Sequence, residues 1–167
     1  MENGKKPVRV CGDHEEIFIL SPGGAVTHLL PGEACPPPEA GSRELLFQRK
    51  ARIWLPVGAG GLRDRIGNTW GGFCMIFCTL LLPRRFVLQN RERLLPGEPP
   101  EQILAEKMRE ILRAQIADQI SRPDWNGSGE NLRSLWEGVR ITFENALRGT
   151  GWEMTAFRPK ILKQTGR

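Results

Sequence analysis

The feature that most constrains the fold is a long uncharged segment near the middle of the chain. No charged residue lies between Arg65 and Arg84, and the thirteen residues 70–82 are mainly apolar. A transmembrane helix needs about 20 apolar residues, whereas two glycines interrupt this segment early and Pro83 ends it. A strand that is buried on both faces has this length and composition. We therefore predict a central strand, with a short membrane-dipping segment as the alternative.

The chain before this segment has the pattern of β-structure. Residues 15–20 and 25–30 are rich in apolar residues and are joined by a Ser-Pro-Gly-Gly turn sequence, so they are predicted to form a hairpin. Residues 44–57 are predicted to form a further strand. The glycine-rich residues 58–61 that follow are predicted to be a flexible connection.

After the apolar segment, the apolar residues recur at helical spacing. Residues 84–94, 101–121 and 131–148 are predicted to be helices, the second opened by two prolines and the third closed by Gly149. Alternation over residues 152–156 then predicts a final strand. The order of strands, helices and one last strand indicates an α+β fold. We expect a largely antiparallel sheet with the two long amphipathic helices packed on one face and a C-terminal return strand.

Length and charge predict one domain with a basic end. The 167 residues suit a single domain, 1–167, with a core of about residues 7–162. The net charge is +5, with eighteen arginines against six lysines, and residues 158–167 contain four basic residues and no acid. This basic tail is predicted to be solvated and frayed. Contact with nucleic acid, an anionic membrane surface or an acidic partner is the alternative.

No combination of residues predicts a catalytic, cofactor or metal site. Cys74 and Cys78 have no second pair to complete a zinc site, and neither His14 nor His28 lies at metal-ligand spacing from a cysteine. Residues 58–61 lack the Lys-Ser/Thr pair of a phosphate-binding loop, and no G-x-S-x-G motif occurs. The absence of such motifs leads us to expect a non-enzymatic protein. Because the four cysteines have no disulfide-framework spacing and no secretory signal pattern is present, we expect a cytoplasmic protein with reduced thiols.

The tryptophans provide candidate residues for binding a partner. The chain has five tryptophans and no tyrosine. Trp54, Trp136 and Trp152 are expected in the core. Trp70 and Trp125 fall at element edges and are candidate anchors for a partner. A basic strip expected beside these two anchors consists of Arg84, Arg85, Arg91 and Arg93.

Three segments together are similar to a known family. They are EEIFIL, GGAV and LPGE within residues 15–33, PRRFVLQN at residues 83–90, and GTGWEMTAFR at residues 149–158. They resemble the opening hairpin, the short helix and the closing strand of SPFH (stomatin/prohibitin/flotillin, or band-7) domains, although Leu82 stands where the family has an aspartate. The resemblance covers about residues 7–162. It implies a non-enzymatic scaffold that self-associates and organises proteins, often at a membrane.

These observations lead to one expected function and two rivals. We expect a cytoplasmic interaction domain that binds itself or a protein partner, with peripheral contact to a membrane surface as a variant. No membrane anchor before the domain and no coiled coil after it are expected. The first rival is a nucleic-acid or anionic-surface binder, although the aromatic residues are expected mostly on the face opposite the arginines. The second is a small enzyme whose site residues come together from separate loops.

Overall fold

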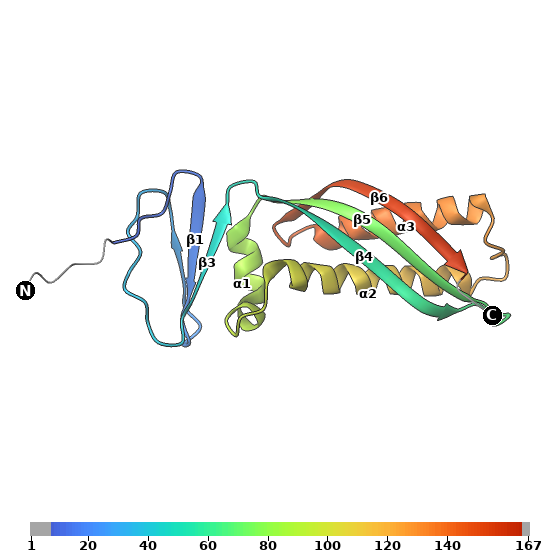
Figure 1. Ribbon diagram of the computed structural model, residues 1–167, viewed down its shortest axis with the longest axis horizontal. Coiled ribbons are helices and arrows are strands. Elements are labelled where there is room, and N and C mark those ends of the chain that lie inside the picture. Colours follow the sequence, from blue (N-terminus) through green and yellow to red (C-terminus); the bar gives the residue numbers. More distant parts are fainter. Residues whose placement is uncertain (1–7, 165–167) are drawn as a thin grey trace, which may run out of the picture.

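Residues 8–164, which are the residues that this computed structural model describes, contain three helices and six strands (Figure 1). In chain order they are β1 (Glu15–Leu20), β2 (Val26–Leu29), β3 (Arg43–Gln48), β4 (Arg52–Arg63), β5 (Thr69–Leu80), α1 (Pro83–Leu94), α2 (Pro100–Ile120), α3 (Gly129–Leu147) and β6 (Trp152–Gln164). The predicted α+β class is confirmed. The strands form two antiparallel sheets of three strands each.

The N-terminal sheet has the strand order β2-β1-β3. The predicted hairpin is confirmed as β1 and β2, and Ser21 N–H donates to the Ala25 carbonyl oxygen at 2.9 Å to close its turn. Phe18 lies in β1 opposite His28 of β2 and Leu45 of β3, and it is fully buried in the main core. The Phe18 side of this sheet therefore packs against the rest of the molecule.

The single strand predicted over residues 44–57 is wrong, because the chain turns between β3 and β4. Ala51 N–H donates to the Gln48 carbonyl oxygen at 3.1 Å, and Lys50 in this turn has a φ of 53°. After the turn, β4 enters the second sheet. Strand-like sequence continues on both sides of the turn, so the pattern does not reveal the change of sheet.

The second sheet has the order β4-β5-β6, and β5 is its middle strand as predicted. Alternate residues of β5 face the helices and are buried. They are Trp70, Gly72, Cys74, Ile76, Cys78 and Leu80. The predicted burial of this strand on both faces holds only in part for its other side, where Met75 and Thr79 are buried but Phe73 is exposed and Phe77 is half-buried.

Residues 58–61 belong to β4 and are not a flexible connection. Gly58 pairs with Phe73 and Ala59 with Gly72, and the register then shifts between Ala59 and Leu62. This irregularity is a β-bulge, and Gly61 within it has a φ of 70°. A bulge often requires such a left-handed residue, which explains why a strand here has the composition of a loop.

Helices α2 and α3 cover one face of the second sheet (Figure 1). Their buried apolar residues are Ile103, Leu104, Met108, Leu112, Ile116 and Ile120 in α2 and Leu135, Val139, Phe143 and Leu147 in α3. Each large side chain of this kind contributes about 1.5–3 kcal/mol by its burial. The Ser128 hydroxyl caps α3 by accepting a hydrogen bond from Asn131 N–H at 3.2 Å. None of the helices of residues 8–164 has an apolar stretch long enough to cross a membrane.

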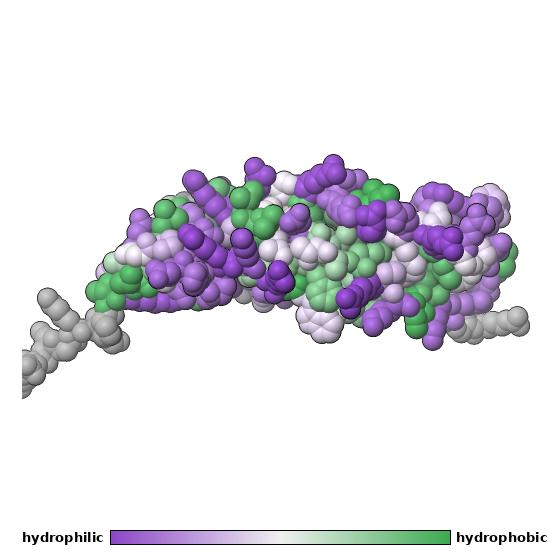
Figure 2. All heavy atoms as spheres, turned by 90° about the horizontal axis from the view of Figure 1, so that it is seen from above, coloured by the Kyte–Doolittle hydropathy of each residue, from purple (hydrophilic) through white to green (hydrophobic). Residues whose placement is uncertain are grey.

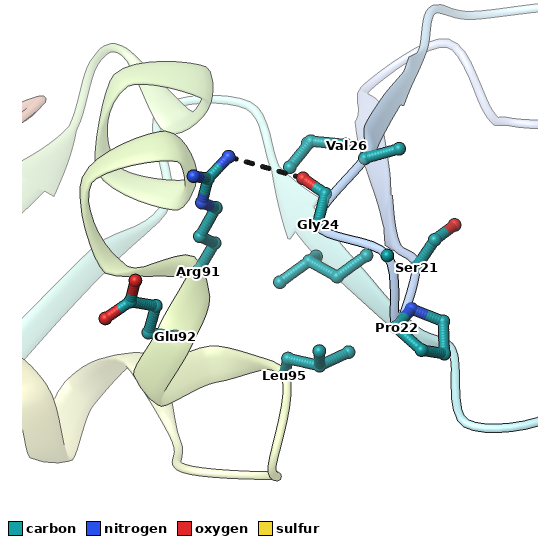
Figure 3. Close-up of a pocket in the computed structure, with 10 residues that line it drawn as sticks. Ser21, Pro22, Gly24, Val26, Arg91, Glu92 and Leu95 are labelled. Carbon is teal, nitrogen blue, oxygen red and sulfur yellow. Dashed lines mark hydrogen bonds between the residues drawn. The ribbon is translucent and has the colours of Figure 1, made fainter.

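Helix α1 lies between the two sheets and joins them. The Arg43 guanidinium of β3 donates to the carbonyl oxygens of Leu94, at the end of α1, and of Glu98 (2.8 Å to Glu98). Arg91 of α1 donates to the Gly24 carbonyl oxygen in the β1–β2 turn at 3.3 Å, across a small open cavity (Figure 3). One continuous cluster of buried side chains runs from β1 through α1 into the second sheet.

Candidate interaction face

The side of the second sheet that faces away from α2 and α3 carries three rows of mainly apolar side chains. We call this side the open face. The strand register places Trp54, Phe77 and Ala156 in the first row, Pro56, Met75 and Arg158 in the second, and Gly58, Phe73 and Ile161 in the third. Residues in one row are neighbours on adjacent strands, so their side chains are close enough to contact one another.

The open face is exposed although it is apolar. The exposed fractions are 65% for Trp54, 38% for Phe73 and 45% for Ile161, whereas Met75 is covered by its neighbours and only 7% exposed. Figure 2 shows apolar side chains gathered over the middle of the half of the molecule that holds this sheet, with hydrophilic side chains around them. The outer face of an antiparallel sheet is usually polar. A clustered apolar area on such a face indicates an interaction site.

Trp54 was expected in the core, and this expectation is wrong. The side chains of Ile53 and Leu55 point towards the helices, so Trp54 between them points the other way. The alternation in the sequence contains this information, since Arg52, Trp54 and Pro56 share one side of the strand. What the sequence does not contain is which side the helices cover.

Aromatic and cationic groups are in contact on the open face. The ring centroids of Trp54 and Phe77 are 5.9 Å apart, with an angle of 37° between the ring planes. The guanidinium carbon of Arg158 lies 5.4 Å from the centroid of the Phe77 ring. A cation over an aromatic ring at this distance contributes about 0.5–1 kcal/mol at an exposed site. The expectation that aromatics and arginines lie on opposite faces is therefore wrong for these residues.

The ends of the open face are mostly basic. Arg52 and Glu153 flank Thr79 in the row next to α1, and alternation places Arg63 and Lys163 at the far end. Within residues 8–164, no ion pair involves Arg52, Arg63, Arg158 or Lys163. Among the described residues, the face thus combines apolar rows with four unpaired cations, of which Arg158 lies within the rows and three lie at the ends, and with one acid.

The two outer strands of the sheet are poorly suited to pairing with a further strand. Pro56 in β4 and Pro159 in β6 lack a backbone N–H, and β6 deviates from regular pairing at two places. Prolines and bulges on outer strands prevent the addition of a strand from another chain.

Trp70 and Trp125, the predicted anchors, pack against each other instead. Trp70 is buried, and its indole N–H donates to Asp64 Oδ2 at 2.9 Å. Its ring centroid is 5.0 Å from that of the half-buried Trp125, in an edge-to-face arrangement, and Gly127 lies directly over it. Both residues therefore fasten the α2–α3 loop to the sheet.

The basic strip is not beside these tryptophans. Arg84, Arg85, Arg91 and Arg93 all lie on α1, which follows the end of β5, whereas Trp70 is at its start. A strand rises about 3.3 Å per residue, so β5 separates the two groups by roughly 35 Å. Arg91 contacts the β1–β2 turn, and Arg93 pairs with Glu98 and Glu106. Arg84 and Arg85 are exposed and line a groove together with Leu82.

The basic tail is largely ordered. Residues 158–164 form the second half of β6, whereas residues 165–167 lie outside the described part of the chain. The expectation of a frayed end is wrong for the former, because β6 pairs with β5 up to Gln164 opposite Trp70. The strand brings Arg158 and Lys163 onto the open face.

The cysteines are arranged for packing. Cys74 and Cys78 are buried on the helix side of β5, and burial raises the pKa of each thiol to about 12. Burial likewise raises the pKa of Cys11, whose thiol donates to the Glu15 carbonyl oxygen at 3.4 Å. In the part of the chain that the structure describes, no three His, Cys, Asp or Glu side chains are grouped as a metal site would require.

No family model matches the sequence, and no curated protein is significantly similar to it. The open face is therefore the candidate functional site.

Proposed function

We propose that this protein is a non-enzymatic interaction domain that binds a protein through the open face. The observation that carries the proposal is the set of uncovered apolar rows on the open face, where Trp54 of the outer strand β4 has 65% of its surface exposed. Large aromatic residues at the centre of a surface are the residues that contribute most to protein–protein binding. A covering partner would remove Trp54, Phe73 and Ile161 from water together.

The resemblance to SPFH domains supports the same class of function. It favours a scaffold that assembles with itself or with other proteins in the cytoplasm or at a membrane surface. The site predicted from the sequence, two tryptophan anchors beside a basic strip, does not support it. Trp70 and Trp125 pack against each other, and Arg91 and Arg93 have partners within the chain. The proposed site is therefore the open face, with Trp54 and Phe73 as its anchors.

Site-specific photo-crosslinking in the source cell tests this proposal. A photoreactive phenylalanine analogue replaces Phe73, and in a control protein it replaces Ile66, which is 85% exposed on the β4–β5 turn outside the open face. We expect a discrete protein adduct from position 73 and not from position 66. An adduct of twice the subunit mass identifies self-association. The absence of an adduct, or the same adducts from both positions, overturns the proposal.

A second candidate function is binding of single-stranded nucleic acid. It is favoured by one observation, the contact of Arg158 with Phe77 beside the exposed Trp54. Aromatic side chains on a sheet and neighbouring cations bind bases and phosphates in many such proteins. Titration of the tryptophan fluorescence with an oligothymidylate at low and high salt distinguishes the candidates, because phosphate binding weakens steeply with salt.

A further inference from the structure

Arg158 is an unpaired cation among the apolar rows of the open face, on the outer strand β6. It stands in the second row, between the row that contains Phe77 and the row that contains Phe73. Its guanidinium lies over the Phe77 ring, and within residues 8–164 it has neither an ion pair nor a hydrogen-bonded acceptor. In the free protein, water solvates this charge.

A partner that covers the open face removes that water. Burial of an unpaired guanidinium is strongly unfavourable when no carboxylate replaces the water. The partner must therefore place an acidic group opposite Arg158. Arg52, Arg63 and Lys163 around the apolar rows favour further acids at the edges of the partner.

A second copy of the chain meets this requirement poorly. Of the residues between 8 and 164, the open face has four basic ones and only Glu153 as an acid, and Glu153 is in the end row with Arg52. Two such faces in contact would bring like charges together. The charge pattern therefore favours a different protein with an excess of acid.

The dimensions of the apolar rows favour a helix as the bound element. Phe73 and Phe77 are four residues apart in β5, which corresponds to about 13 Å along the strand. About nine residues of an α-helix span this distance, and a helix about 10 Å wide covers three strands spaced about 4.8 Å apart. An added strand is disfavoured by Pro56 and Pro159 at the outer strands.

We propose that the open face binds an amphipathic helix of another protein, whose apolar stripe covers Trp54, Phe73 and Ile161 and whose carboxylate pairs with Arg158. This inference rests on the proposed function, because it names the partner class of the same face. The bound helix would lie along β5 on the side opposite α2 and α3, so that the sheet would be covered by helices on both faces.

Selection from a displayed library of helical peptides tests this proposal with the full chain. The library keeps a fixed apolar stripe and randomises the flanking positions between acidic, basic and neutral residues. We expect enrichment of Glu and Asp at a flanking position on the parent protein. On an Arg158→Met variant, which retains a long apolar side chain, the preference for acid should disappear. An Arg133→Met variant, altered at an exposed arginine of α3, should select the same peptides as the parent.

The affinity of the best peptide gives a second readout. We expect about a tenfold loss of affinity in Arg158→Met, or about 1.4 kcal/mol, and no change in Arg133→Met. Selected peptides that require Trp54 but show no preference for acid would overturn this inference and leave the proposed function standing. If every selected peptide still binds the Trp54→Ser variant, or if no peptide is selected, both this inference and the proposed function are overturned. Displacement of the peptide by an oligothymidylate that itself requires Trp54 would assign the face to nucleic acid and overturn both.

Discussion

Trp70 donates its indole N–H to Asp64 Oδ2 across the turn that joins β4 and β5, at a distance of 2.9 Å. Asp64 also accepts hydrogen bonds from the backbone N–H groups of Ile66 (3.0 Å) and Asn68 (2.8 Å). These contacts, that of Trp70 foremost, hold the pKa of the Asp64 carboxyl below its ordinary value. The ionised carboxylate therefore organises the turn and orients the buried indole.

We expect acid to weaken this turn. A carboxyl with a lower pKa in the folded protein stabilises the fold above its unfolded pKa, and this stabilisation is lost as the pH falls towards the folded pKa. The parent should lose unfolding free energy below about pH 4. Asp64→Asn should be less stable than the parent at neutral pH but should lose less on acidification. Urea unfolding at about pH 7 and about pH 3 measures both; equal acid sensitivity would refute the assigned role.

Gly72 should tolerate no side chain without a loss of stability. A Cβ there would lie 2.9 Å from Ile116 Cδ1 and 3.1 Å from Leu162 Cδ1, where α2 crosses the sheet. Overpacking of this kind typically costs about 1–3 kcal/mol. Gly72→Ala should therefore lower the unfolding free energy by this amount in urea titration. Gly60→Ala is the matched control, since nothing lies within 4 Å of a Cβ at that strand position.

Gly151 should be more sensitive to substitution than Gly149. Both have positive φ angles, 94° and 77°, but a Cβ at Gly151 would lie 2.4 Å from the Leu82 carbonyl oxygen, whereas at Gly149 it meets open space. The left-handed conformation alone costs about 1–2 kcal/mol. Gly149→Ala should show a loss of this size in thermal unfolding. Gly151→Ala should lose clearly more, because backbone atoms must move; similar losses would argue against the observed approach of Leu82.

The thiols of Cys74 and Cys78 should be unreactive in the folded protein. Burial raises their pKa to about 12, so almost no thiolate forms near neutral pH, and both side chains are inaccessible. Cys35 is partly exposed and should react first with an aromatic disulfide reagent. Mass spectrometry of labelled peptides before and after unfolding measures the order. Labelling of Cys74 as fast as Cys35 in native buffer would be inconsistent with the packed sheet.

The elements that could be predicted from the sequence are those whose signals are local. β5, α2 and α3 were recognisable because their apolar periods and their flanking prolines, glycines and cap residues lie within each element. The turn at Lys50 could not be predicted, because two strands of different sheets follow each other with continuous strand-like sequence. Likewise, the glycines of residues 58–61 have a loop composition but form a bulge inside β4.

The site was predictable only in part, for a similar reason. The sequence places Trp54 and Arg52 on one side of a strand, but no local signal specifies that both long helices cover the other side. The contact of Arg158 with Phe77 joins residues that are far apart in the chain, so it depends on the register of β5 with β6. The glycines beside Trp70 suggest an anchor at an element edge, whereas its hydrogen bond to Asp64 shows a packing role.

The prolines at Pro56 and Pro159 have a consequence for how the molecule behaves at high concentration. A flat apolar sheet with regular outer strands is a template for stacking into fibrils. Here the outer strands are interrupted by prolines and bulges, while the apolar side chains stay accessible between them. The prolines and bulges thus oppose the strand-by-strand addition on which fibril growth depends, although the apolar side chains of the open face remain accessible.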